Sequence, residues 1–290
     1  MIRFRRSILE SSLVPMTSVA SERGVVAIID VLGFKSAVKT DADGVLSTLE
    51  SVAKAIEEEQ NSYDNSPDAS LESVAGHLKP KLKLHRASLG DTLVIGLEIN
   101  TTSVEEYRPG ASSLDSLYGL LHMGKILNTV LRTAIGTPAP LLYRGTFALG
   151  HFVVKENIYF GDAVFEAAEL YGQSQAAIVW AAPSAMEILE LVLDPTNELY
   201  DRASKIVNSD RSIRDPWVKH DIPLKSGGSY ESLAVNPYYG AEGELMEIQR
   251  QVLRAFSGHA PDVLAKRHNT KKFLEVARKQ AEEMARAKPG

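Results

Sequence analysis

The sequence predicts an α+β fold, and three observations favour this class. Val25–Ile29 is a run of five apolar residues, mostly β-branched, which is typical of a strand buried on both faces. Ser36–Glu58 follows it with apolar residues at helical spacing. Two strand-like runs, Leu82–Leu89 and Thr92–Glu98, are separated only by Gly90-Asp91, which supplies the geometry that a tight hairpin turn needs.

The next elements complete a recognisable order. Leu114–Leu131 is predicted to be a helix with one broad apolar face, and Gly136–Pro140 ends it. Leu141–Val154 and Asn157–Phe160 are predicted strands, and Asp162–Leu170 is a predicted helix that opens after Gly161. The order strand, helix, hairpin, helix, strand is that of a split βαβ, ferredoxin-like sandwich.

The C-terminal part has weaker patterns. Ala176–Trp180 is predicted to be a buried strand, and Ser184 with Glu187 has the form of a helix capping box. Asp194–Lys219 is charged and predicted to be irregular, whereas Tyr230–Val235 is the last predicted core strand. Apolar residues return to helical spacing from Leu245 onward. We therefore expect an N-terminal extension over residues 1–20, a main domain over residues 21–236 and a helical C-terminal tail over residues 237–290.

Composition limits the function classes. The chain has 290 residues, of which 44% are hydrophobic and 24% charged, as in ordinary globular proteins. Its net charge of −5 gives no global basic field for nucleic acid or an anionic membrane. The absence of cysteine excludes disulfides, thiolate metal sites and cysteine nucleophiles. No apolar run approaches the roughly 18 residues of a membrane span. We expect a cytoplasmic protein with no nucleic-acid partner and no membrane insertion.

Two carboxylates stand out. Asp30 ends the buried strand, Asp91 lies in the hairpin turn, and the ferredoxin-like order places both at the same end of adjacent central strands. Burying one carboxylate costs several kcal/mol unless a partner cancels its charge, and two would repel unless a cation lay between them. Oxygen ligands favour Mg²⁺ or Mn²⁺ over zinc. The alternative for Asp30 is a helix N-cap or a solvated loop acid.

Three motifs carry a family resemblance. Ile29-Asp30-Val31-Leu32-Gly33-Phe34-Lys35-Ser36, Leu89-Gly90-Asp91-Thr92-Leu93-Val94 and Tyr159-Phe160-Gly161-Asp162-Ala163-Val164 are similar, in this order, to the three signatures of class III nucleotidyl cyclases. The resemblance covers about residues 22–235, with insertions at about 59–80 and 100–113. It implies that residues 21–236 are a catalytic domain of a homodimer with active sites at the subunit interface. It also implies two Mg²⁺ or Mn²⁺ ions held by Asp30, Asp91 and the carbonyl of Val31.

The same resemblance implies how a nucleoside triphosphate is bound. The backbone N–H groups around Gly33, Phe34 and Ser36 hold the β- and γ-phosphates at a helix N-terminus, and Lys225 is similar to the family's phosphate-binding lysine. The reaction is an in-line attack of the ribose 3′-oxygen on the α-phosphorus, with pyrophosphate leaving.

Departures from the purine cyclases concern base recognition and the transition state. The positions of their helix Asn and Arg correspond to Phe165 and Glu169 here. Their base-reading Lys falls near Ala87 and its Asp partner near Ile158, so neither base-reading group is present. Arg144 is the candidate for the transition-state arginine, because an Arg on a strand beside the site can hold phosphate bidentately.

The combination of Leu-Gly-Asp-Thr, Tyr-Arg-Gly and Phe-Gly-Asp-Ala most resembles the bacterial pyrimidine cyclases of Pycsar anti-phage defence, which make cyclic UMP or cyclic CMP for a separately encoded effector. UTP is ranked over CTP on family frequency alone. Two other classes stay open: a degenerate cyclase-fold module that binds nucleotide without catalysis, and another nucleotidyl enzyme on the same palm. The second is disfavoured because no Gly-Gly-Asp-Glu-Phe-like run occurs.

Overall fold

The structure, a computed structural model, describes residues 22–65, 80–100, 111–156, 158–209, 216–239, 245–256, 258 and 260–286. The expected N-terminal extension over residues 1–20 lies outside them. The strands are β1 (Glu22–Val31), β2 (Lys81–Leu89), β3 (Thr92–Asn100), β4 (Tyr143–Lys155), β5 (Ile158–Phe160), β6 (Val179–Ala181), β7 (Trp217–Pro223) and β8 (Ser229–Val235). The helices are α1 (Phe34–Thr40), α2 (Ala42–Asp64), α4 (Ala111–Gly136), α5 (Asp162–Leu170), α6 (Pro183–Leu193), α7 (Tyr200–Ser209), α8 (Leu245–Ala255) and α9 (Pro261–Arg286).

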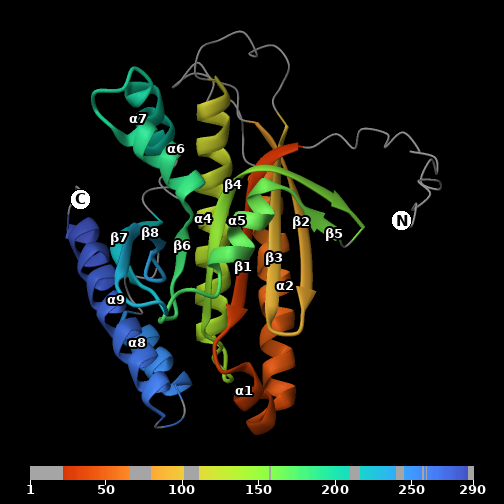
Figure 1. The fold of residues 1–290 in the computed structure, drawn as a ribbon, viewed down its shortest axis with the longest axis vertical. Helices are drawn as coiled ribbons and strands as arrows, with labels where there is room; N and C mark the ends of the chain where they lie inside the picture. The colour runs from red at the N-terminus through yellow and green to blue at the C-terminus, as the bar shows by residue number, and fades with distance from the viewer. Residues whose placement is uncertain are drawn as a thin grey trace, which may run out of the picture.

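The predicted ferredoxin-like core is confirmed by the strand order. The sheet runs β2-β3-β1-β4-β6-β8-β7, with β5 paired to β4 (Figure 1). Its first four strands are antiparallel to one another, whereas β4 and β6 are parallel, and α2 and α4 connect the first four as the split βαβ order requires. The predicted hairpin is also confirmed, because β2 and β3 flank Gly90, whose φ of +61° lies in the left-handed region that glycine tolerates.

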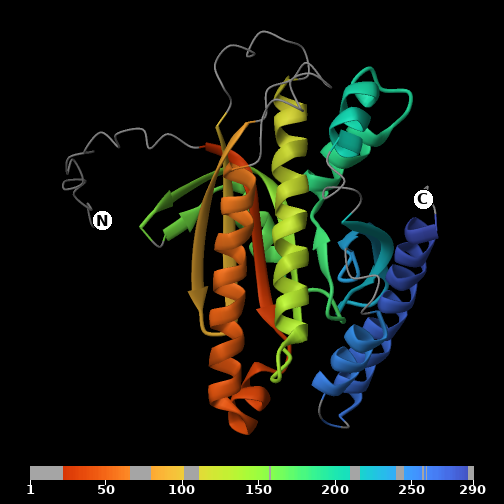
Figure 2. The same cartoon turned by 180° about the vertical axis from the view of Figure 1, so that it is seen from behind.

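Helices cover both faces of this sheet. Figure 2 shows α2 and α4 side by side across one face, and α5 lies on the other face against β1 and β4. Strand residues alternate between faces, so Ile29 packs under α2 and α4 while Ile28 packs under α5. Val25–Ile29 are all buried, which confirms a strand covered on both sides. Asp30 shares the alternation of Ile28 and therefore projects toward the α5 face.

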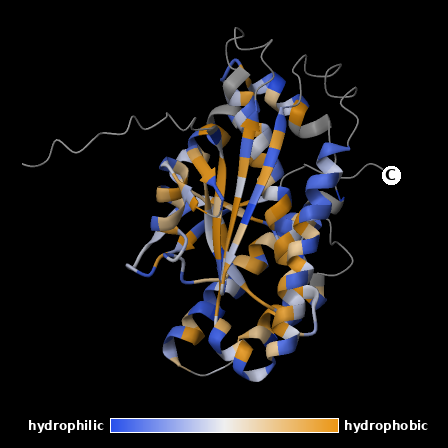
Figure 3. Cartoon of the chain, turned by 90° about the vertical axis from the view of Figure 1, so that its right-hand side faces the viewer, coloured by the Kyte–Doolittle hydropathy of each residue, from blue (hydrophilic) through white to orange (hydrophobic). Residues whose placement is uncertain are grey.

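The C-terminal helices are part of the core. α9 lies along β7, and its Phe273 and Ala277 join a buried cluster with Trp180 and Ile222 of the sheet. Figure 3 shows the same pattern in colour, with hydrophobic residues concentrated on the strands and the inner sides of the helices. None of the helices in the described ranges is long and apolar enough to cross a membrane.

Several predicted boundaries were wrong. The predicted helix over Ser36–Glu58 is two helices, because the Asp41 side chain accepts the Gly44 N–H at 2.9 Å and starts a new helix that continues to Asp64. Ser184 is no N-cap, because its hydroxyl instead accepts the N–H of Leu149 at 2.9 Å. The stretch Asp194–Lys219 contains α7 and the start of β7, which tertiary packing of Ile206 and Trp217 stabilises despite its charged composition.

Candidate active site

Asp30 and Asp91 lie at the same end of the sheet, as predicted. Asp30 is in register with Thr92 of β3 on one side and with Arg144 of β4 on the other. The N–H of Val31 donates to the carbonyl of Asp91 at 3.0 Å, so the hairpin turn is fastened directly to the end of β1. This edge is the lower end of β1 in Figure 1.

An ion pair occupies the centre of the edge. Arg144 Nε donates to Asp30 Oδ1 at 2.9 Å and Nη2 donates to Oδ2 at 3.0 Å, and the two side chains are 13% and 14% exposed. A bidentate pair of this geometry is among the strongest charge-assisted contacts in proteins. We expected a metal ion to neutralise the charge of Asp30, but the Arg144 guanidinium already neutralises it and would compete with a metal ion.

Further basic groups surround this pair. Arg144 Nη1 donates to the carbonyl of Ser174 at 3.3 Å, and the N–H of Lys225 donates to the carbonyl of Gln173 at 2.9 Å. Lys225 is exposed as a whole residue, but partial burial of its ammonium lowers its pKa. Arg144 lowers this pKa further, and Asp30 raises it. The structure therefore brings together Asp30, Asp91, Arg144 and Lys225.

The predicted phosphate turn begins with Gly33. Its φ of +74° lies in the left-handed region, and open space surrounds the position of a Cβ, so the turn depends on glycine for its backbone conformation. The N–H groups of Ser36 and Ala37 donate to the carbonyl of Gly33 at 2.9 and 3.1 Å. Ser36 is exposed, whereas Phe34 packs against the main core. The hydroxyl of Ser36, rather than its N–H, is thus the group that can meet a ligand.

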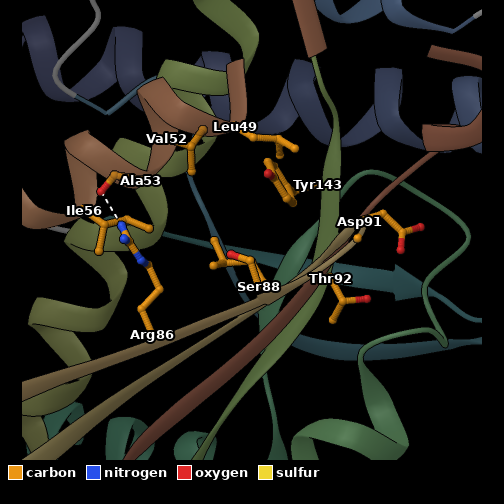
Figure 4. A pocket seen from close by; sticks show the side chains of 11 residues that line it. Leu49, Val52, Ala53, Ile56, Arg86, Ser88, Asp91, Thr92 and Tyr143 are labelled. Atoms are coloured by element: carbon orange, nitrogen blue, oxygen red, sulfur yellow. Dashed lines mark hydrogen bonds between the residues drawn. The ribbon is translucent and has the colours of Figure 1, made fainter. Parts of the chain in front are cut away.

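A small cavity beside Asp91 is not the substrate site. It lies between α2 and the β2–β3 hairpin and has a volume of about 50 Å³, far below the ~300 Å³ at which small-molecule pockets begin. Figure 4 shows Arg86 at one end and Asp91 at the other. Arg86 is held on the helix side, because it donates to the Ala53 carbonyl at 2.6 Å and to Glu57 at 3.0 Å. It points away from the α5 face.

The two base-reading positions are not brought together at the Asp30 end. Ala87 is in register with Val94 on the edge hairpin, two residues from its tip. Ile158 pairs with Lys155 at the far end of β4, and its side chain is 63% exposed. Of the family's helix positions, both Phe165 and Glu169 are exposed on α5.

The oxygen donors at this edge are of the kind that a divalent cation prefers. Within the described part of the chain, no group of three or more His, Asp or Glu side chains could hold a metal ion by itself. Mg²⁺, however, is usually bound by one or two carboxylates with substrate phosphates completing its shell. Asp30 and Asp91 match that pattern, and each carboxylate oxygen has a second lone pair beyond the one that a hydrogen bond uses.

One group of contacts has no signal in the sequence. The segment Ser174–Ala177, which receives Arg144, also holds α9 through the Ala177 N–H, which donates to Thr270 Oγ1 at 2.8 Å. These partners are 93 residues apart in sequence. The pairing of Arg144 with Asp30 likewise depends on the register of β1 against β4.

Comparison with known proteins gives similarity in fold at low identity. No protein-family model matches the chain, and no match was found among curated proteins. The catalytic core of a rhodopsin-guanylyl cyclase with converted specificity, solved with ATPαS, is 13% identical with a TM-score of 0.38, covering 74% of this chain and 95% of that one.

Two structures from Pseudomonas aeruginosa are similar at the same level. A class III adenylyl cyclase-like ATP-binding protein is 13% identical with a TM-score of 0.38, over 67% of this chain and 42% of that one. The adenylyl cyclase CyaB is 14% identical with a TM-score of 0.33, over 74% and 93%. At these values the function has to be argued from the residues of this chain.

Proposed function

We propose that this chain is a pyrimidine nucleotide cyclase that converts UTP to 3′,5′-cyclic UMP and pyrophosphate, as a second-messenger synthase in anti-phage defence. The observation that carries the proposal is the placement of Asp30 and Asp91 at one end of adjacent central strands, with Arg144 and Lys225 beside them. Carboxylates that can hold Mg²⁺ and cations that can hold phosphate are the two requirements of phosphoryl transfer.

Asp30, Asp91 and the carbonyl of Val31 are the residues that would hold two Mn²⁺ or Mg²⁺ ions. When bound, such ions lower the pKa of the ribose 3′-hydroxyl and neutralise charge on the departing pyrophosphate. Arg144 can turn from Asp30 to a phosphate oxygen, because a guanidinium binds either group with the same bidentate geometry. The remaining phosphate contacts come from Lys225, the hydroxyl of Ser36 and the backbone beside Gly33 and Phe34.

A homodimer is part of the proposal. Four large apolar side chains are exposed on the hairpin tip, β5 and α5, and they are Leu89 (84%), Ile158 (63%), Phe160 (42%) and Phe165 (60%). Large apolar side chains exposed to this degree are suited to a contact with another protein chain. We propose that a second copy of the chain binds over these residues, covering Ile158 and lying near the hairpin that carries Ala87.

Base selection rests on the absence of purine-reading groups. Ala87 and Ile158 can neither donate nor accept a hydrogen bond through their side chains, so they offer nothing to the edge of adenine or guanine. A pyrimidine base is smaller than a purine base, and the sequence motifs most resemble those of pyrimidine cyclases. CTP is the alternative substrate, since no residue here distinguishes the two pyrimidines.

A second candidate function is nucleotide binding without catalysis. The Asp30–Arg144 pair favours it, because both oxygens of the proposed metal ligand already accept hydrogen bonds. In that case Arg144 stays on Asp30, no cation is bound at β1, and the nucleotide is held by the basic groups alone.

One assay separates the candidates. The purified chain is incubated with Mn²⁺ and each of ATP, GTP, CTP and UTP, and the products are identified by mass spectrometry. Cyclic UMP with UTP is the expected product, and cyclic CMP would move the assignment to CTP. Binding of a triphosphate without any cyclic product would establish the non-catalytic module.

Asp91→Asn supplies the control for the site. Asp91 is partly exposed, and its known structural contact is made by its backbone carbonyl, so the variant should fold normally and lose turnover. Asp43→Asn, at an exposed position in the first turn of α2, is the matched substitution that should keep full activity. Unfolding of Asp91→Asn would show that Asp91 is structural.

A further inference from the structure

One short segment anchors two basic residues and helix α9, which come from distant parts of the chain. The carbonyl of Ser174 accepts Arg144 Nη1 at 3.3 Å, and the carbonyl of Gln173 accepts the N–H of Lys225 at 2.9 Å. Helix α9 binds the same segment, since Asn269 Nδ2 donates to the carbonyl of Gln175 at 3.2 Å. The segment Gln173–Ala177 therefore fixes where the bases of these side chains lie relative to one another.

Lys266 lies on the face of α9 that meets this segment. It precedes Asn269 by three residues and Thr270 by four, and residues at these spacings share one face of a helix. Thr270 is 1% exposed, accepts the Ala177 N–H at 2.8 Å and donates to the carbonyl of Lys266 at 2.8 Å. The Lys266 side chain is 25% exposed, so it leaves the helix at the border between this contact and solvent.

Among the three cations of this region, Lys225 is the one without an ion-pair partner in the described part of the chain. Burial, Arg144 and Lys266 all lower the pKa of Lys225, and only Asp30 raises it. Asp30 is held by Arg144 at both oxygens. Lys266 pairs at 3.2 Å with Asp262, but that carboxylate is 65% exposed, and such surface pairs contribute little.

The Lys225 ammonium itself is available to a ligand. Its Nζ lies 4.0 Å from the position that a Cβ on Gly172 would take, so the side chain extends over the same turn that bears Gln173 and Ser174. Across the described ranges, Nζ has no hydrogen-bond or ion-pair partner. Positive φ angles at Gly227 and Gly228, +89° and +78°, form the turn that carries it.

We infer that Lys266 is a third phosphate-binding cation beside Arg144 and Lys225, so that the C-terminal helix α9 is part of the triphosphate site. Arg144 can exchange Asp30 for a phosphate, Lys225 has no ion-pair partner in the described residues, and Lys266 pairs only with an exposed carboxylate. Three such cations suit a chain of three phosphates better than a single phosphate. Helix α9 thereby contributes to the binding of the substrate. That the bound anion is a nucleoside triphosphate rests on the proposed function.

The test measures binding without turnover. The full chain is titrated with inorganic tripolyphosphate and, separately, with inorganic phosphate by isothermal titration calorimetry. Lys266→Gln should weaken tripolyphosphate about tenfold, the loss expected for one charge-assisted contact, and Lys266→Arg should restore most of it. Lys272→Gln is the matched control, because Lys272 is exposed on another face of α9 and its loss should change the affinity less than twofold.

Equal effects of Lys266→Gln and Lys272→Gln, or no binding of tripolyphosphate by the wild-type chain, would overturn the inference. Asp262→Asn provides an independent variant at an exposed position, should Lys266→Gln fail to fold. It releases Lys266 and should tighten tripolyphosphate several-fold, and an unchanged affinity would count against Lys266.

The two proposals fail in different ways. Binding of tripolyphosphate that depends on Lys266, in a chain that cyclises no triphosphate, would refute the proposed function alone. Cyclisation of UTP with an unchanged KM in Lys266→Gln would refute the role of Lys266 alone.

Discussion

The Arg144–Asp30 pair should be one of the strongest single interactions in the fold. It makes two hydrogen bonds of 2.9 and 3.0 Å between side chains that are only 13% and 14% exposed. Surface pairs contribute about 0–1 kcal/mol, whereas removing one partner of a buried pair costs about 3–5 kcal/mol. The small remaining exposure places Arg144→Gln near the lower limit of the buried range, at about 3 kcal/mol.

A double-mutant cycle isolates the pair. Asp30→Asn should cost about 2 kcal/mol, because it leaves the Arg144 guanidinium close to Lys225 without its counter-charge. The double variant should cost much less than the sum, since neither charge is then left alone, and the interaction energy should be about 2 kcal/mol. Urea unfolding with a common m-value measures each free energy of unfolding. Additivity within about 0.5 kcal/mol would refute the reasoning.

The same variant tests competition for Asp30. In the absence of nucleotide, Arg144→Gln should bind Mn²⁺ at least tenfold more tightly than the wild-type chain, because a unit positive charge about 4 Å from a bound ion costs several kcal/mol at an effective dielectric constant near 20. Electron paramagnetic resonance of free Mn²⁺ gives the affinity directly. Unchanged affinity would mean that Asp30 is no metal ligand.

Three further outcomes concern the fold. Gly145→Ala should destabilise by about 1–3 kcal/mol or prevent folding, because its Cβ would lie 2.2 Å from the Ile28 carbonyl oxygen, whereas Gly136→Ala meets open space and should be tolerated in thermal unfolding. Burial lowers the pKa of His220 below its ordinary 6.5, while Asp221 raises it, so the unfolded chain binds more protons just below pH 6.5. The free energy of unfolding should therefore fall as the pH drops through that range, and His220→Gln should reduce the slope. Phe273→Ala, at a position 1% exposed, should cost about 3–5 kcal/mol and lower a single unfolding transition; a separate transition for α8 and α9 would show that the tail folds independently.

The features that local sequence determines were predictable. The hairpin depends on Gly90-Asp91 between two strand patterns, and the buried strand depends on five consecutive apolar residues, so both follow from neighbours in the chain. The ferredoxin-like order then follows from the sequence of elements, and it places Asp30 beside Asp91. The proximity of Asp30 and Asp91 could therefore be predicted without knowledge of any side-chain contact.

Long-range side-chain contacts were not predictable. Asp30 and Arg144 are 114 residues apart, and their contact depends on the exact register of β1 against β4. A shift of one residue would move Arg144 to the opposite face of the sheet. The element α7 and strand β7 were missed for a related reason, because charged residues dominate that stretch and burial of Ile206 and Trp217 is decided by the rest of the fold.

The charges at this edge constrain how a nucleotide could be accepted. Arg144 neutralises Asp30, whereas Lys225 has no ion-pair partner in the described residues and Lys266 pairs only with the exposed Asp262, so these two lysines can attract an anion. A polyphosphate that reaches Lys225 also offers Arg144 a second bidentate partner, and the turn of Arg144 toward it frees both oxygens of Asp30. Under the proposed function, the carboxylate would therefore become available to a metal ion once phosphate is present. The pairing with Arg144 avoids the cost of an unpaired, largely buried carboxylate, which explains how a buried strand can end in an acid.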